Sequence, residues 1–144
     1  RKYLNASRTG DAKAIIGAIR IAEASYHAET LVYLSCSSSL TDWYPAKPNG
    51  KKRHWISTHT AVDCWRTLNV TTDSPTTFGF AVVAGSPGQV PPQPNTVSKP
   101  TWPNPTSEPW FVIQAAGDAD RDGKFSLFVS SSFTGEIYVE NESE

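Results

Sequence analysis

Three aspartates at alternate positions are the clearest candidates for binding chemistry. Asp118, Asp120 and Asp122 are followed directly by Gly123. This is the first half of the D-x-D-x-D-G calcium loop, in which alternate carboxylates converge on one hard cation. The second half is missing, because the twelfth loop position, normally a bidentate glutamate, is Val129. Two interpretations stay open: a calcium site completed by other ligands, or a tight hairpin turn built from Asp and Gly.

Cys36 and Cys64 are the only cysteines in the chain. A cysteine pair in a small domain rich in Ser, Thr and Trp predicts one disulfide, formed in an oxidising compartment. Two buried free thiols are the alternative. Neither cysteine has CxxC spacing, and His27, His54 and His59 do not lie at metal-ligand spacing from them, so the sequence does not predict a structural zinc.

Aromatic and basic side chains are the candidates for surface contacts. The chain has five tryptophans, and exposed aromatic rings stack on sugars and anchor interfaces. Trp102 lies among prolines and is the tryptophan that we expect to be exposed, whereas most of the others are expected in the core. Lys51, Lys52 and Arg53 form a basic cluster that either meets an acidic surface or a neighbouring subunit, or is simply a solvated loop.

Catalytic motifs are absent from the sequence. There is no GxSxG, no HExxH and no glycine-rich phosphate cradle. Ser57, His59 and Asp63 are close in sequence, but a triad is defined by spatial geometry. We therefore predict no catalytic residues, no enzyme activity and no cofactor, apart from calcium at the Asp turn.

The bulk properties favour one domain and exclude a nucleic-acid binder. The 144 residues suit a single domain, 1–144. The 13 basic and 14 acidic side chains leave a net charge of -1, without the basic excess typical of nucleic-acid binding. The sequence contains no apolar run of about 20 residues, and it therefore predicts no membrane span in these residues. Because the chain has no methionine, we expect a processed or truncated product.

The first quarter of the chain has the pattern of an amphipathic helix. Apolar residues recur at steps of three and four from Asn5 to Ala28, which predicts a helix over 5–28. The predicted buried stripe of this helix consists of Ala12, Ile15, Ile19, Ala22 and Tyr26. The predicted solvent face carries Asp11, Lys13, Arg20, Glu23 and His27.

The remaining chain predicts a loop and then a sheet. Residues 30–74 show no lasting period and are interpreted as an αβ loop held by the two cysteines. Alternating apolar residues between 76 and 139 predict a roughly four-stranded antiparallel sheet. A proline-rich loop interrupts it at 86–108, since proline cannot pair within a sheet. The predicted fold class is α+β, with the helix stripe packed on one face of the sheet.

Two stretches carry a family resemblance. The opening RKYLNASRTGDAKAIIGAIRIAEASYHAE resembles the part of the type IV pilin helix that follows its membrane-spanning half. The later AAGDADRDGKFSLFVS resembles a hairpin found in many pilin heads. The element order, helix then αβ loop then sheet, is also similar to that of type IV pilins and pseudopilins. The cysteine pair departs from well-known pilins, whose disulfide closes a carboxy-terminal loop.

The resemblance implies a structural subunit of a type IV pilus filament, with roles in adhesion, surface motility, DNA uptake or contact with prey or host cells. It implies a homo-oligomer or a pilin hetero-oligomer, anchored in the inner membrane by an amino-terminal helix that is missing here. After assembly the head would lie on the bacterial cell surface, with no nucleic acid expected on the isolated head. The alternatives are a pseudopilin of a type II secretion system, or a free-standing carbohydrate-binding or adhesive module.

Overall fold

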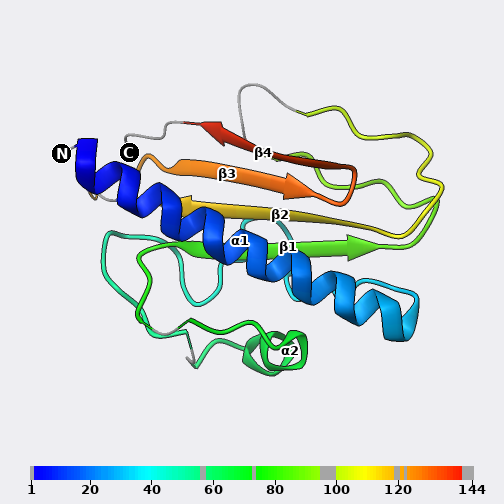
Figure 1. The fold of residues 1–144 in the computed structure, drawn as a ribbon, viewed down its shortest axis with the longest axis horizontal. Helices are drawn as coiled ribbons and strands as arrows, with labels where there is room; N and C mark the ends of the chain where they lie inside the picture. The colour runs from blue at the N-terminus through cyan, green and yellow to red at the C-terminus, as the bar shows by residue number, and fades with distance from the viewer. Residues whose placement is uncertain are drawn as a thin grey trace.

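One long helix followed by a four-stranded antiparallel sheet makes up the fold, which confirms the α+β class (Figure 1). A computed structural model describes residues 2–55, 58–72, 74–94, 100–118, 121 and 123–140, with side chains from Thr9 onward. The elements are α1 (Lys2–Thr30), α2 (Val62–Leu68), β1 (Gly79–Gly85), β2 (Trp110–Gly117), β3 (Ser126–Ser131) and β4 (Thr134–Glu140).

The sheet is a simple meander in the order β1-β2-β3-β4, with each pair antiparallel. The register sets Val82 opposite Ile113 and Ile113 opposite Ser130. Because side chains alternate along a strand, Phe80, Val82 and Ile113 point to the same face. Figure 1 shows α1 lying diagonally across one face of the sheet.

The buried line of α1 runs through Ala12, Ile16 and Ile19, all fully buried in the main core. Glu23 continues this line at the next turn and is equally buried. The predicted stripe is therefore right at Ala12 and Ile19 but rotated elsewhere. The other predicted members, Ile15, Ala22 and Tyr26, are only partly buried and pack against the rim of the core.

The opposite face of the sheet is covered by coil rather than by a helix. Trp102 and Leu40 pack there with Trp110, and Trp43 packs there with Ala81. As a result, every residue of β2 and of β3 is buried. Because both faces of these strands are covered, one sheet of this size can bury many large aromatic side chains.

The segment after α1 covers the outer edge of β1. The Ser37 N–H donates to the Val82 carbonyl oxygen at 3.0 Å, and the Tyr44 N–H donates to the Phe80 carbonyl oxygen at 2.8 Å. The Ser37 hydroxyl accepts the Val82 N–H at 3.1 Å. These bonds satisfy an edge that would otherwise be open to pairing with another chain.

A disulfide joins Cys36 to Cys64, which confirms the predicted bridge. It ties the coil beside β1 to α2, a helix that the sequence did not predict because seven residues span too few turns to show a period. The predicted αβ loop 30–74 includes α2, and its residues 56, 57 and 73 lie outside the described residues. Residues 95–99 of the predicted proline-rich loop also lie outside them.

Candidate interaction surfaces

The side of α1 turned away from the sheet carries no charged residue along its centre. We call this surface the outer face of α1. It consists of Gly10, Ala14, Gly17, Ala18, Ile21, Ser25 and Ala28, which are exposed or half-buried. Ile21 is 71% exposed. A helix that faces water normally carries charged side chains on that side, so this face has the composition of a contact surface.

Two glycines on the outer face have no packing role within the chain. A Cβ atom added at Gly10 or at Gly17 would meet nothing within 4 Å. Glycine in a helix interior costs about 1 kcal/mol relative to alanine. The described part of the chain therefore gains no packing contact from these glycines, whereas another molecule would gain room to approach the helix backbone.

The inner side of α1 contains an acidic residue that the sequence analysis placed on the solvent face. Glu23 is 0% exposed, so its prediction as a solvent-facing residue was wrong. Its Oε1 accepts the Leu34 N–H at 2.8 Å, and its Oε2 has no hydrogen-bond partner among the described residues. Burial raises the pKa of Glu23 from 4.5 to about 8, although the Leu34 hydrogen bond lowers it. The carboxyl group is therefore mostly protonated at neutral pH.

Arg20 was also predicted to face water, and it contacts the sheet instead. Its guanidinium donates to the Ser130 hydroxyl at 2.8 Å and to the Ser131 carbonyl oxygen. It also lies 5.6 Å from the centre of the Phe111 ring. The charge is thus held by oxygen acceptors and an aromatic ring at the helix–sheet junction.

Tyr33 closes the end of this junction. Its ring stacks on His27 at 4.5 Å and meets Phe111 edge-on at 4.9 Å. Burial raises the pKa of Tyr33, and Glu23 and Glu108 raise it further while Arg20 lowers it. The chain reversal after α1 therefore brings His27, Tyr33 and Glu23 into one cluster.

The Asp turn is described only in part. Asp118 is buried, and its Oδ2 accepts the Gly123 N–H at 2.9 Å. Asp120 and Asp122 lie outside the described residues, so the predicted calcium site remains a prediction. Within the part of the chain that the structure describes, no group of three or more His, Cys, Asp and Glu side chains is placed to hold a metal ion.

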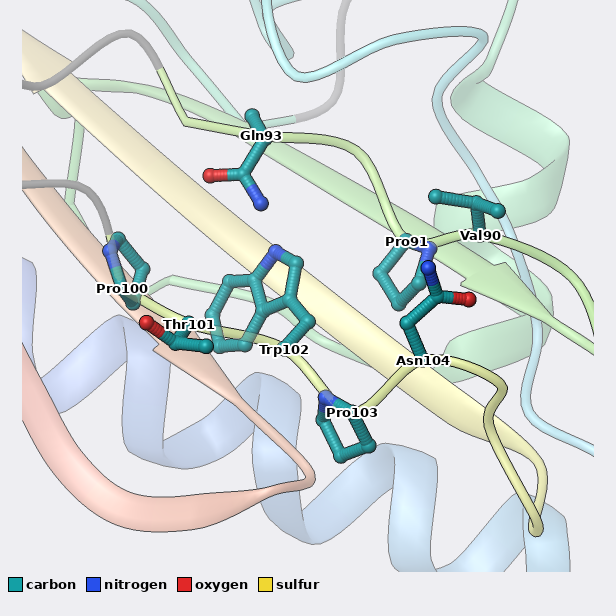
Figure 2. A pocket seen from close by; sticks show the side chains of 8 residues that line it. All are labelled: Val90, Pro91, Gln93, Pro100, Thr101, Trp102, Pro103 and Asn104. Carbon is teal, nitrogen blue, oxygen red and sulfur yellow. The ribbon is translucent and has the colours of Figure 1, made fainter.

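A pocket of about 380 Å³ lies in the proline-rich region, next to Trp102 (Figure 2). Its lining consists of Val90, Pro91, Gln93, Pro100, Thr101, Trp102, Pro103 and Asn104. None of these side chains titrates, so the described lining, which excludes residues 95–99, offers apolar surface with amide and hydroxyl groups and no acid, base or nucleophilic thiol. Figure 2 shows the Gln93 amide pointing toward the indole of Trp102.

Trp102 is only 8% exposed, which makes its prediction as an exposed contact residue wrong. Its indole N–H donates to the Pro92 carbonyl oxygen at 3.0 Å, and its ring packs on Phe133 at 5.3 Å. The remaining four tryptophans are buried as well. The Trp102 ring therefore packs against residues of its own chain, and little of its aromatic surface is left for a ligand to contact.

His59 and Asp42 form a pair that the sequence did not suggest. His59 Nε2 lies 3.5 Å from Asp42 Oδ1, and His59 Nδ1 accepts the Ala61 N–H at 2.9 Å. Asp42 Oδ2 also accepts the Ser38 hydroxyl at 3.2 Å. The carboxylate thus stands between the serine and the histidine, whereas nucleophile activation needs the histidine in the middle. The two residues lie 17 positions apart in the sequence, so no local motif could have indicated the pair.

The basic cluster is exposed as the sequence allowed: Lys51, Lys52 and Arg53 all face solvent. Among the described residues, no helix is both long enough and apolar enough to span a membrane. Comparisons of the chain with protein-family models, curated proteins and solved structures found no match.

Proposed function

We propose that this chain is the head domain of a type IV pilin or pilin-like protein and acts as a structural subunit of a filament. The single observation that carries the proposal is the outer face of α1, which has no charged residue along its centre and is rich in small residues although it faces away from the sheet, with the exposed Asp11, Lys13 and Glu29 at its borders. In this proposal, that face packs against helices of neighbouring copies, and small side chains let helix axes approach closely.

The fold supports the same proposal. Pilin-like heads place one long helix on an antiparallel sheet, which is the arrangement of α1 and the strands here. The resemblance of the helix and of the Asp hairpin to pilin sequences points in the same direction. A membrane anchor preceding α1, assembly at the bacterial surface and roles in adhesion or motility belong to this proposal.

A non-catalytic role is part of the proposal. The pocket beside Trp102 has no titratable side chain among its described lining residues, and the carboxylate-centred arrangement of Ser38, Asp42 and His59 does not activate a nucleophile. The disulfide between Cys36 and Cys64 favours an oxidising compartment, as expected for a surface filament.

Filament imaging with matched variants tests the proposal. In the producing cell, Ile21→Asp places a charge at the centre of the outer face, and Thr71→Asp places the same charge at an exposed position elsewhere. Both heads should fold, because neither position is buried. We expect cells with Ile21→Asp to lose surface filaments and cells with Thr71→Asp to keep them.

Two results would count against the proposal. One is a normal number of filaments with Ile21→Asp replacing every copy of the wild-type chain. The other is a deletion strain whose filaments are unchanged and from which purified wild-type filaments contain none of this chain.

A further inference from the structure

A run of exposed cations lies in one loop on the surface of the head. We call residues 47–54 the basic loop. Its cationic and titratable members are Lys47, Lys51, Lys52, Arg53 and His54, all exposed. The whole chain has a net charge of only -1, so a cluster of this kind reflects segregated charge rather than an overall basic composition.

The basic loop is held at both sides by backbone pairing. Before it, the Tyr44 and Phe80 backbones exchange two hydrogen bonds of 2.8 and 2.7 Å. Near its end, the Arg53 and Thr76 backbones exchange two of 2.7 and 2.8 Å. Both anchors lie on the same stretch of chain leading into β1. The lysines between them are therefore displayed from a fixed base.

A close contact adds one more cation to this surface. Gly50 has φ of +81°, and a Cβ added to it would lie 2.6 Å from the Cγ atom of Arg121. Only glycine therefore allows the exposed Arg121 side chain to lie against the basic loop. Residues from two distant parts of the sequence thus contribute charge to one surface.

These charges are not neutralised by the part of the chain that the structure describes. The ion pairs in it join His59 to Asp42 and Arg66 to Asp63, and neither involves the basic loop. Asp118, whose carbonyl oxygen borders Gly50, keeps its carboxylate buried against the Gly123 N–H. Asp120 and Asp122, which flank Arg121 in the sequence, lie outside the described residues. As far as the described residues go, the surface attracts anions from solution, most strongly at low ionic strength.

The surroundings of the loop indicate which class of polyanion fits. Proteins that hold single-stranded nucleic acid combine basic grooves with exposed aromatic rings on which bases stack. Here the aromatic residues that flank the loop, Trp43, Tyr44 and Trp55, are buried. The site offers charge without a stacking platform, which suits a polymer that carries anionic groups and no bases.

We propose that the basic loop, together with Arg121, binds an acidic polysaccharide. Lysine ammonium and arginine guanidinium groups donate to carboxylate or sulfate oxygens along the polymer, and several such contacts on one chain act together. This inference concerns the folded head alone and does not depend on whether the head assembles into a filament.

Binding of the purified head to polygalacturonate, with neutral dextran as a control polymer, tests the inference. We expect binding to polygalacturonate only, weakening steeply between about 50 and about 200 mM salt, as electrostatic binding does. Lys51→Glu/Lys52→Glu should weaken binding by about tenfold or more, because two attractive charges become repulsive. The matched control, Lys13→Glu/Arg66→Glu, makes the same change in net charge at exposed positions away from the loop and should bind like the wild type.

Three outcomes would overturn the inference. The first is absence of binding to polygalacturonate at low salt by a head with a wild-type thermal melt. The second is an equal loss in both double variants, which would indicate net charge and not the loop. The third is tighter binding of single-stranded DNA than of polygalacturonate at equal charge concentration, which would assign the surface to nucleic acid.

Discussion

The two sides of α1 each depart from the pattern of an ordinary surface helix at particular positions, although Ala12, Ile16 and Ile19 form an apolar buried line. The inner side, which packs on the sheet, carries Arg20 and the fully buried Glu23. The outer side, which faces away, carries Gly10, Ala14 and Ile21 along its centre. In a typical amphipathic helix the charged residues would face water and the apolar residues would face the core.

The inner side tolerates its polar groups because the sheet and the chain reversal provide partners. Arg20 has acceptors at the end of β3, and Glu23 is neutral and hydrogen-bonded to Leu34. Gly10 and Gly17 on the outer side, by contrast, face open space, since a Cβ atom added to either would meet nothing within 4 Å. The charged residues on the inner side of α1 are therefore explained by contacts within the chain, whereas the composition of the outer face is explained by the contact with another copy that we propose.

The largest expected effect comes from adding a charge to each side. Ile19→Asp places a carboxylate in the main core and should unfold the domain, since burying a charge costs several kcal/mol against a total free energy of unfolding of about 5 to 15 kcal/mol. Ile21→Asp, two residues away, should change the free energy of unfolding by less than about 0.5 kcal/mol. Thermal melts of both variants check this. An unchanged cooperative melt of Ile19→Asp would refute the assignment of the inner side.

The buried carboxyl predicts an unusual pH dependence. Because the folded pKa of Glu23 is about 8 and the unfolded value is 4.5, the folded state binds the proton more tightly. Its contribution to stability is complete below pH 4.5 and is lost as pH rises through 8, by at most about 5 kcal/mol. Glu23→Gln keeps an acceptor for Leu34 and should flatten the profile.

Urea unfolding of wild type and Glu23→Gln from pH 5 to about 9 measures this difference. Arg20, Tyr33 and Glu108 act on the same cluster and are common to both proteins, so subtracting the two profiles isolates Glu23. Parallel profiles would mean that Glu23 is ionised in the folded protein and that the inner side is wetter than the structure describes.

Removing the disulfide measures how much this bridge contributes to holding the coil and α2 against the core on the inner side of α1. Cys36 and Cys64, which are 28 residues apart, fasten the coil and α2 to the core that contains Ile16 and Ile19. Cys36→Ser/Cys64→Ser should lower the free energy of unfolding by about 3 to 4 kcal/mol in the chain-entropy model. Denaturant titrations give the value. A change under about 1 kcal/mol would show that α1 and α2 pack equally well without the bridge.

The smallest effect concerns the glycines of the outer face. Gly17→Ala meets open space and should stabilise the isolated domain by about 1 kcal/mol through helix propensity. If the outer face packs closely against another copy, the same methyl group should reduce filament number. A variant that is less stable as a monomer would contradict the open space at this position.

The sequence predicted the long helix and the strands well, because their patterns depend on local periodicity. Alternation at Phe78, Phe80 and Val82 and at Phe125, Leu127 and Val129 indicated β1 and β3, and the helix extends only a few residues beyond its predicted bounds. Such patterns arise whenever one side of an element meets a core.

The candidate surfaces were harder to predict, because they depend on contacts between distant residues. Glu23 is buried since the chain reverses and presents the Leu34 N–H, which no helical period encodes. Trp102 is covered because Pro92 and Phe133 surround it from separate segments. The sequence did contain one signal for the burial of Glu23. Glu23 lies four residues after Ile19, on the same side of the helix as Ala12 and Ile16.

A cross-linking measurement in the producing cell tests the outer-face proposal most directly. A photoreactive side chain is placed at Ala18, on the outer face, and separately at Thr71 as a control, and cells are irradiated while filaments are present. The proposal predicts a ladder of covalent multimers from Ala18 that mass spectrometry traces to a second copy of this chain, and none from Thr71. Monomer alone from Ala18, in filaments shown to contain the chain, would contradict it.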